Sequence, residues 1–166
     1  MRPVNLYTLE VSIIEGPVAE QFAKANPVMS RTIEIRGLQT LEQLHRAIFN
    51  AFDRWEDCHL CEFQFGSGPH ETDGPRYVMP AAMNSPFDDR PAAGIIDETR
   101  LDDLYLEVGR TFGYWYDFGD NWYHQIDVIA IGEPAAKTRY PRVIARVGQS
   151  PPQYMDWDAE EGDDEE

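Results

Sequence analysis

The feature that most restricts the fold is a pair of β-prone runs, residues 112–118 and 122–131, separated only by Gly119-Asp120-Asn121. A turn of this composition between two such runs predicts a β-hairpin, with positive φ angles at Gly119 and Asn121. The second run is apolar toward its far end, so we expect it to lie centrally in a sheet. The apolar residues there are Ile126, Val128, Ile129 and Ile131.

Other strands are predicted where apolar and polar residues alternate with a period of two. These segments are residues 7–13, 32–36 and 59–65. Residues 66–94 contain four Gly and five Pro, and this stretch is too long for an ordinary connection. We interpret it as a mobile flap or extended excursion, in which only residues 77–79 can add a short strand.

The main helix is predicted over residues 41–55, because apolar residues recur there at helical spacing. They are Leu41, Leu44, Ile48, Phe52 and Trp55. Thr40 and Gln43 have the spacing of a capping box at its start. A shorter helix is expected over residues 18–24 with Phe22 as its anchor, and another short one after a capping Thr99.

These elements predict one α+β domain over residues 1–154, with a mixed, largely antiparallel sheet, one main helix and a shorter second helix packed on it. A chain of 166 residues with 42% apolar content can close one sizeable core. Residues 155–166 are predicted to be a disordered acidic tail, because eight of the 16 net negative charges lie between Asp156 and Glu166.

Charge and hydropathy disfavour several classes of function. An acidic body repels phosphate, which argues against general nucleic-acid binding. The exception is a small basic cluster, Lys137, Arg139, Arg142 and Arg146, which can contact a few phosphates in a nucleic-acid accessory protein. Neither a membrane span nor a secretion signal is recognisable, so we expect a cytoplasmic protein without membrane contact.

The two cysteines, Cys58 and Cys61, make one Cys-x-x-Cys, which is half of a structural zinc site. On a strand their side chains point to opposite faces, which disfavours a shared metal ion. We expect reduced thiols and no cofactor.

The densest group of chemically active side chains lies around the predicted hairpin. Asp117, Asp120, Trp122 and His124 fall within eight residues, and such a set can form a metal or acid–base site. The structural alternative, which we favour, has both aspartates accepting turn amides while Trp122 and His124 pack in the core. His45 lies at the edge of the helix stripe and is expected to bond to backbone.

Several local motifs together suggest a family. They are Tyr-Asp-Phe-Gly-Asp-x-Trp-x-His at 116–124, Thr-Leu-x-x-Leu-His-x-x-Ile at 40–48, His-Leu-x-x-Phe at 59–63, Ser-Arg-Thr-Ile at 30–33 and Gly-x-Ser-Pro-Pro-Gln-Tyr at 148–154. With these motifs the chain resembles the plasmid pRiA4b ORF-3-like family nearly end to end. The resemblance implies an α+β fold and a passenger protein of plasmids and mobile elements, in a family without an agreed biochemical activity.

Some members of that family are labelled transposon resolvase-like. A serine recombinase needs a nucleophilic serine among arginines on a DNA-facing surface, and the acidic body here offers no such surface. The family-motif candidates for a site are His45, His59, Asp117, Gly119, Asp120, Trp122 and His124.

Three functional hypotheses follow. The first is a non-enzymatic domain that binds a protein partner through a face near the Gly119 hairpin and residues 66–94. The second is a metal-dependent hydrolase whose ligands would be His45, His59, His124, Asp117 and Asp120. The third is the nucleic-acid accessory protein. Motifs for phosphate loops, nucleotide binding and serine hydrolases are absent from the sequence, which favours the first.

Overall fold

A computed structural model describes residues 5–56, 59–70, 73–82 and 92–154. The strands are β1 (Leu6–Glu15), β2 (Ser30–Arg36), β3 (Cys61–Gln64), β4 (Arg76–Val78), β5 (Gly94–Ile95), β6 (Thr111–Tyr116), β7 (Trp122–Gly132) and β8 (Arg142–Val147). The helices are α1 (Glu20–Ala25) and α2 (Leu41–Ala51), with two 3-10 turns, η1 (Pro80–Ala82) and η2 (Leu101–Leu104).

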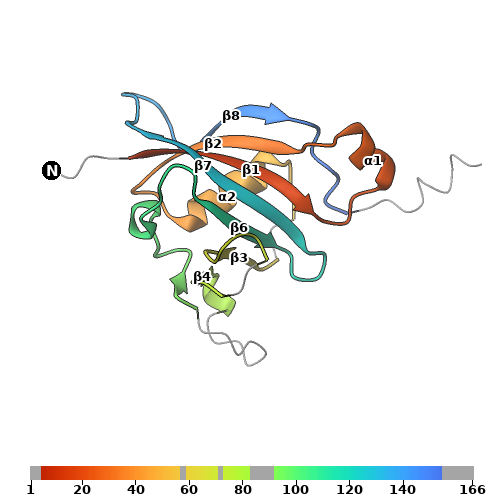
Figure 1. The fold of residues 1–166 in the computed structure, drawn as a ribbon, viewed down its shortest axis with the longest axis horizontal. Coiled ribbons are helices and arrows are strands. Elements are labelled where there is room, and N and C mark those ends of the chain that lie inside the picture. The colour runs from red at the N-terminus through yellow and green to blue at the C-terminus, as the bar shows by residue number, and fades with distance from the viewer. Residues whose placement is uncertain (1–4, 57–58, 71–72, 83–91, 155–166) are drawn as a thin grey trace, which may run out of the picture.

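The strands form one eight-stranded sheet in the order β5-β4-β3-β6-β7-β1-β2-β8. Neighbouring strands are antiparallel except β4 and β5, which are parallel. The sheet is therefore mixed and mostly antiparallel, as predicted. β7 lies between β6 and β1, which confirms its central position (Figure 1).

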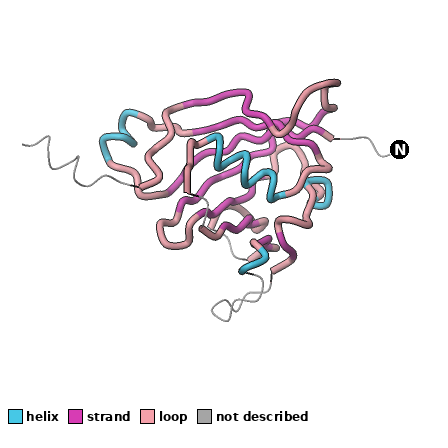
Figure 2. The backbone as a smooth tube through the Cα atoms, turned by 180° about the vertical axis from the view of Figure 1, so that it is seen from behind, coloured by secondary structure: helices cyan, strands magenta, loops and turns pink. Residues whose placement is uncertain are grey.

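The core lies between the sheet and α2, which crosses one face of the sheet (Figure 2). The capping box at Thr40 is present, with the Thr40 side chain accepting from the Gln43 amide. The predicted helix stripe is buried from Leu41 to Phe52. By contrast, α1 lies beside the end of the sheet between β1 and β2, and none of its residues is fully buried (Figure 1).

The main helix ends four residues earlier than predicted. Asp53 adopts a left-handed φ of 55°, which is incompatible with a continuing α-helix. The chain turns there, the Arg54 amide donates to the Phe49 carbonyl, and Trp55 is directed into solvent. The prediction that Trp55 belongs to the buried stripe was therefore wrong.

The hairpin at 117–121 is present, with one correction to its turn chemistry. Positive φ angles occur at Asp117 and Asn121, both 59°, and not at Gly119. The Asn121 amide donates to the Asp117 carbonyl over 2.7 Å, which closes the turn. Asp and Asn tolerate the left-handed region better than most residues, because their short side chains bond locally.

Parts of the 66–94 excursion belong to the sheet. β4 pairs with β3 and confirms the short strand predicted near residues 77–79, while β5, which was not predicted, extends this edge. Thr99 does not cap the next turn: its hydroxyl donates to the Ile95 carbonyl, and Arg100 occupies the cap position of η2. The remainder of the excursion, 71–72 and 83–91, lies outside the described residues, as do Cys58 and the acidic tail.

Within the described ranges, α2 is the longest helix at 11 residues, and no helix there has the length and apolarity to cross a membrane.

Candidate functional site: an aromatic groove along the C-terminal segment

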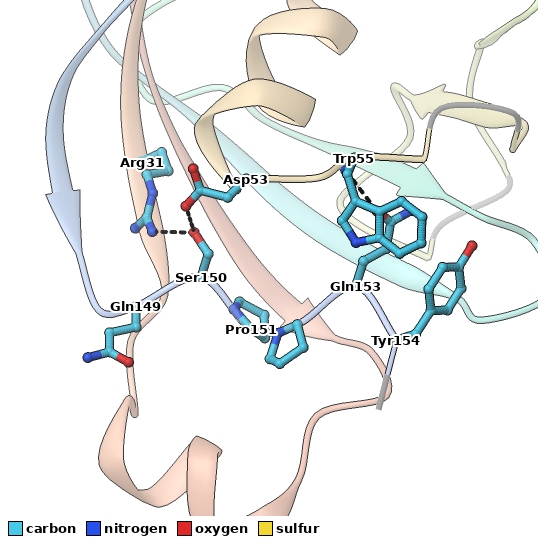
Figure 3. Close-up of a pocket in the computed structure, with 9 residues that line it drawn as sticks. Arg31, Asp53, Trp55, Gln149, Ser150, Pro151, Gln153 and Tyr154 are labelled. Carbon is cyan, nitrogen blue, oxygen red and sulfur yellow. Dashed lines mark hydrogen bonds between the residues drawn. The ribbon is translucent and has the colours of Figure 1, made fainter. Parts of the chain in front are cut away.

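An open groove of about 570 Å³ lies where the chain leaves α2 and the last described residues return to it. We call it the aromatic groove. Its lining consists of Arg31, Asp53, Trp55 and residues 149–154, which we call the C-terminal segment. Figure 3 shows Trp55 and Tyr154 toward one end, with Arg31, Asp53 and Ser150 toward the other.

Trp55 is the dominant feature of the groove. The residue is 69% exposed, although tryptophan is usually largely buried. The Tyr154 ring meets it edge-to-face, with 5.4 Å between centroids and 72° between planes. The groove therefore presents an aromatic pair to solvent.

Gln153 fixes the backbone beneath the aromatic pair. Its side-chain oxygen accepts from the amides of Trp55 and Glu56, over 3.0 and 3.1 Å, and its side-chain nitrogen donates to the Glu56 carbonyl over 2.8 Å. Gln153 is 3% exposed, so these bonds are shielded from water. Because one side chain joins both walls, the groove is held in shape before any ligand arrives.

Arg31 fastens the other end of the groove. Its guanidinium donates to the carbonyls of Ala51, Ser30, Val147 and Gly148 and to the Ser150 hydroxyl, over 2.7 to 3.1 Å. The Ser150 hydroxyl donates to Asp53 Oδ2 over 2.9 Å. Arg31 is 2% exposed, and burial lowers its pKa, followed in effect by the charge of Arg146. Its role is to join β2, α2 and the C-terminal segment.

Arg54 supports the groove from inside. Its Nη1 donates to the Pro151 carbonyl over 2.7 Å, and its guanidinium lies 4.2 Å from the centroid of the buried Trp122 ring. Burial lowers the pKa of Arg54 to about 10. Trp122 is 0% exposed, which confirms its prediction as a core residue.

A polar cluster borders the Tyr154 end of the groove. His59 Nε2 lies 2.6 Å from the Tyr154 hydroxyl, which donates to Glu56 Oε2 over 3.0 Å. His59 Nδ1 lies 3.6 Å from Asp117 Oδ2. Asp117 Oδ1 accepts from the amides of Gly119 and Asp120, as the structural alternative for this aspartate proposed. The cluster thus links the family-motif hairpin to the C-terminal segment.

The other two family-motif histidines lie in the core, and both contact Tyr114. His45 Nδ1 is 2.6 Å from the Tyr114 hydroxyl, which makes this side chain one of its hydrogen-bond partners. His124 is 2% exposed, and its Nδ1 lies 3.2 Å from the Tyr114 carbonyl oxygen. Burial, followed by the charge of Arg54, lowers the pKa of His124 to about 3. His124 is therefore neutral at physiological pH.

Four of the five residues of the metal hypothesis divide between these two places, and the fifth, Asp120, lies in the hairpin turn, where its amide donates to Asp117 Oδ1 over 3.2 Å. His59 and Asp117 are in contact, whereas His45 and His124 contact Tyr114. Across the part of the chain that the structure describes, no three His, Cys, Asp or Glu side chains are grouped to hold a metal ion. Cys61 is fully buried in β3, and burial raises the pKa of its thiol well above the usual range.

The basic cluster is divided by an irregularity in β8, a strand that was not predicted. Arg142 pairs with Glu34 and Arg146 with Arg31, with a register shift between these pairs. Directly paired residues share a face of the sheet. Arg31 and Glu34 are three residues apart in β2 and lie on opposite faces, so their partners Arg146 and Arg142 also point to opposite faces. Arg142 donates to Glu34 over 2.7 Å. The four basic residues therefore do not form one patch.

Sequence reasoning missed the groove itself. Arg31, Gln153 and Tyr154 appeared only as parts of family motifs, and Trp55 was assigned to the core. The sequence carried no clear signal for the exposure of Trp55, because Asp53 and Arg54 between Phe52 and Trp55 are compatible with an amphipathic helix.

Comparison with known proteins agrees with these motifs. The family model of the plasmid pRiA4b ORF-3-like protein matches residues 20–157. The uncharacterized protein y4hQ of Sinorhizobium fredii (strain NBRC 101917 / NGR234) is 28% identical over 133 residues, covering 76% of this chain and 59% of that relative. The chain thus spans somewhat over half the length of this curated relative.

A solved structure has the same fold. The protein of unknown function MM3350 from Methanosarcina mazei Go1 superposes with a TM-score of 0.66 and 27% identity, covering 87% of this chain and 71% of that one. The family-model match over residues 20–157 takes in α2, the hairpin and the aromatic groove, and it shows that the chain belongs to the plasmid pRiA4b ORF-3-like protein family.

Proposed function

We propose that this domain is a non-enzymatic interaction module that binds a protein partner through the aromatic groove. The observation that carries the proposal is the exposed Trp55, 69% accessible, on a wall already fixed by Gln153 and Arg31. Aromatic residues in fixed positions dominate the binding energy of protein interfaces. A groove held in shape before binding also loses less conformational entropy when a ligand enters.

This location differs from the face first expected. The groove lies at the end of α2, and the polar cluster at its Tyr154 end meets the hairpin through the contact of His59 with Asp117. The hydrolase hypothesis receives less support, because its histidines are divided between the groove edge and the core. The nucleic-acid hypothesis is weakened by the opposite orientation of Arg142 and Arg146.

The test is quantitative capture of cellular proteins by the immobilised full chain. Trp55→Ala removes the exposed indole, and circular dichroism checks that the variant is folded. The matched control is Tyr105→Asn, which removes an 89% exposed aromatic from a different pocket, lined in part by Phe65 and Tyr77. Asparagine suits this position because Tyr105 has a left-handed φ of 52°.

We expect at least one protein to be captured by wild type and Tyr105→Asn and to be lost with Trp55→Ala. Capture that is equal for wild type and Trp55→Ala, or lost only with Tyr105→Asn, would contradict the proposal.

A further inference from the structure

The chemistry of the aromatic groove indicates what kind of segment it accepts. We propose that its ligand is a proline-rich segment in polyproline II conformation that carries an arginine or lysine. This inference rests on the proposed function and adds the class of ligand.

Backbone hydrogen bonding disfavours a ligand that adds as a β-strand. Such a ligand needs a row of free backbone amides and carbonyls. Along the groove, Pro151 and Pro152 have no amide hydrogen, while the amides of Trp55 and Glu56 donate to Gln153 and that of Gln149 donates to Asn26. A polyproline II segment forms no backbone hydrogen-bond ladder, so it does not need free amides or carbonyls along these walls.

The aromatic pair fits a proline side chain. Trp55 and Tyr154 are in edge-to-face contact, at 72° to each other with their centroids 5.4 Å apart, so a proline ring can pack on the pair from the solvent side. Proline-rich segments bind in grooves lined by aromatic rings, where the preformed helix keeps the entropic cost low. An amphipathic helix requires apolar anchors over several turns, and the lining toward Arg31, Asp53 and Ser150 is polar.

The Trp55 indole also offers a hydrogen-bond donor. Within the described residues no acceptor occupies the Trp55 Nε1–H, and the side chain is mostly in solvent. The carbonyls of a polyproline II segment are free to accept, because that helix has no internal hydrogen bonds. The ring therefore provides both a packing surface and a polar contact to the same ligand.

The charge at the end of the groove opposite the aromatic pair favours a basic ligand. Asp53 is exposed, and its Oδ2 accepts from Ser150, whereas no described residue bonds its Oδ1. The neighbouring cations, Arg31 and Arg54, are both buried and donate to protein groups, so they offset part of the charge of Asp53 without offering a site for an anion. The net charge of −16 further favours the approach of a cationic segment.

Fluorescence anisotropy with labelled synthetic peptides tests this inference on the full chain. The probe is a peptide of about ten prolines, roughly three turns of polyproline II helix, with an arginine at each end. The first control peptide replaces the prolines by alternating Gly and Ser and keeps both arginines. The second keeps the prolines and replaces both arginines by glutamates.

We expect saturable binding of the arginine-flanked proline peptide with a Kd below about 1 mM, and binding of both control peptides weaker by at least about tenfold. Trp55→Ala should weaken binding of the probe by at least about tenfold, and Tyr105→Asn should leave it unchanged. Asp53→Asn should weaken binding of the probe. It should leave binding of the glutamate-flanked peptide at least as strong as in wild type.

Equal binding of the proline and Gly-Ser peptides, or binding of the probe that Trp55→Ala does not weaken, would overturn the inference. No detectable binding of the probe would do the same. If cellular capture still depends on Trp55 in that case, the groove remains the interaction site and only the ligand class is wrong. If capture is also independent of Trp55, both proposals fail.

Discussion

At the scale of single residues, the interior of this protein combines a neutral histidine with a buried cation. His124 and Arg54 lie in the same part of the core, next to Tyr114 and Trp122. The His124 imidazole cannot take up a second proton there without adding a second positive charge away from water. The consequence is a pH-dependent contribution of His124 to the stability of the fold.

The pKa of His124 is lowered to about 3 in the folded state, against about 6.5 in an unfolded chain. Below pH 6.5 the unfolded state therefore binds a proton that the folded state does not. The stabilisation from keeping His124 neutral is full above about pH 6.5 and decreases by up to about 1.4 kcal/mol per pH unit as the pH falls toward 3.

His124→Gln should remove this component. The measurement is the free energy of unfolding in urea between pH 4 and 7, taken as the difference between wild type and variant, which cancels the other groups. His70→Gln, at an exposed position, is the control. A difference that is constant over this pH range would show that His124 is not the group responsible.

Trp122 is a second residue whose removal should have a large effect. Trp122→Ala is expected to lower the free energy of unfolding by about 3 to 5 kcal/mol, the usual range for a buried large aromatic. The substitution also removes the ring on which Arg54 is stacked. Trp115→Ala, at a half-buried position on the neighbouring strand, should lower the free energy of unfolding by less. Equal costs in chemical denaturation would contradict the assignment of Trp122 to the core.

At the scale of elements, the C-terminal segment is attached by side chains and not by strand pairing. Gln153→Ala removes the acceptor for the Trp55 and Glu56 amides and is expected to cost about 1 to 3 kcal/mol, the penalty for buried groups left unpaired. Gln149→Ala, an exposed glutamine of the same segment, should change stability by less than about 0.5 kcal/mol. Urea denaturation of both variants tests the difference.

Elements specified by local sequence were predictable, and those specified by tertiary contacts were not. The start of α2 follows from the capping box of Thr40 and Gln43, and β1 follows from alternation. β8 was missed because it is a largely exposed edge strand with an irregular register, so its sequence lacks a clear period of two. The end of α2 was missed because Trp55 continues the helical spacing, although Asp53 has already ended the helix.

The candidate site was the least predictable part for the same reason. Its lining comes from β2, the turn after α2 and the C-terminal segment, which are brought together by the bonds of Arg31 and Gln153. Sequence spacing carries no information about such contacts between distant segments. His59 and Asp117 both belong to the family motifs, so their contact could be proposed from the sequence. Their separation from His45 and His124 is visible only in the folded structure.

At the scale of the whole molecule, the net charge of −16 is divided between the body and the acidic tail. The tail, residues 155–166, contains eight acidic residues and lies outside the described residues. Like charges at this density repel one another, and the tail has few apolar residues, so we predict that it contributes little to folding. The C-terminal segment directly before it is predicted to be essential, because Ser150, Pro151, Gln153 and Tyr154 all bond to the body.

Two truncations separate these contributions. Ending the chain after Tyr154 keeps every one of those bonds and is expected to change the unfolding free energy by less than about 1 kcal/mol, equivalent to a shift in Tm of about 2 to 4 °C. Ending it after Gln149 removes the partners of Arg54 Nη1, Arg31 Nη2 and the Trp55 amide, and should lower the Tm by several times that amount. Differential scanning calorimetry of both chains measures the contrast. A large loss already at Tyr154 would mean that the acidic tail stabilises the body, and would extend the domain boundary beyond residue 154.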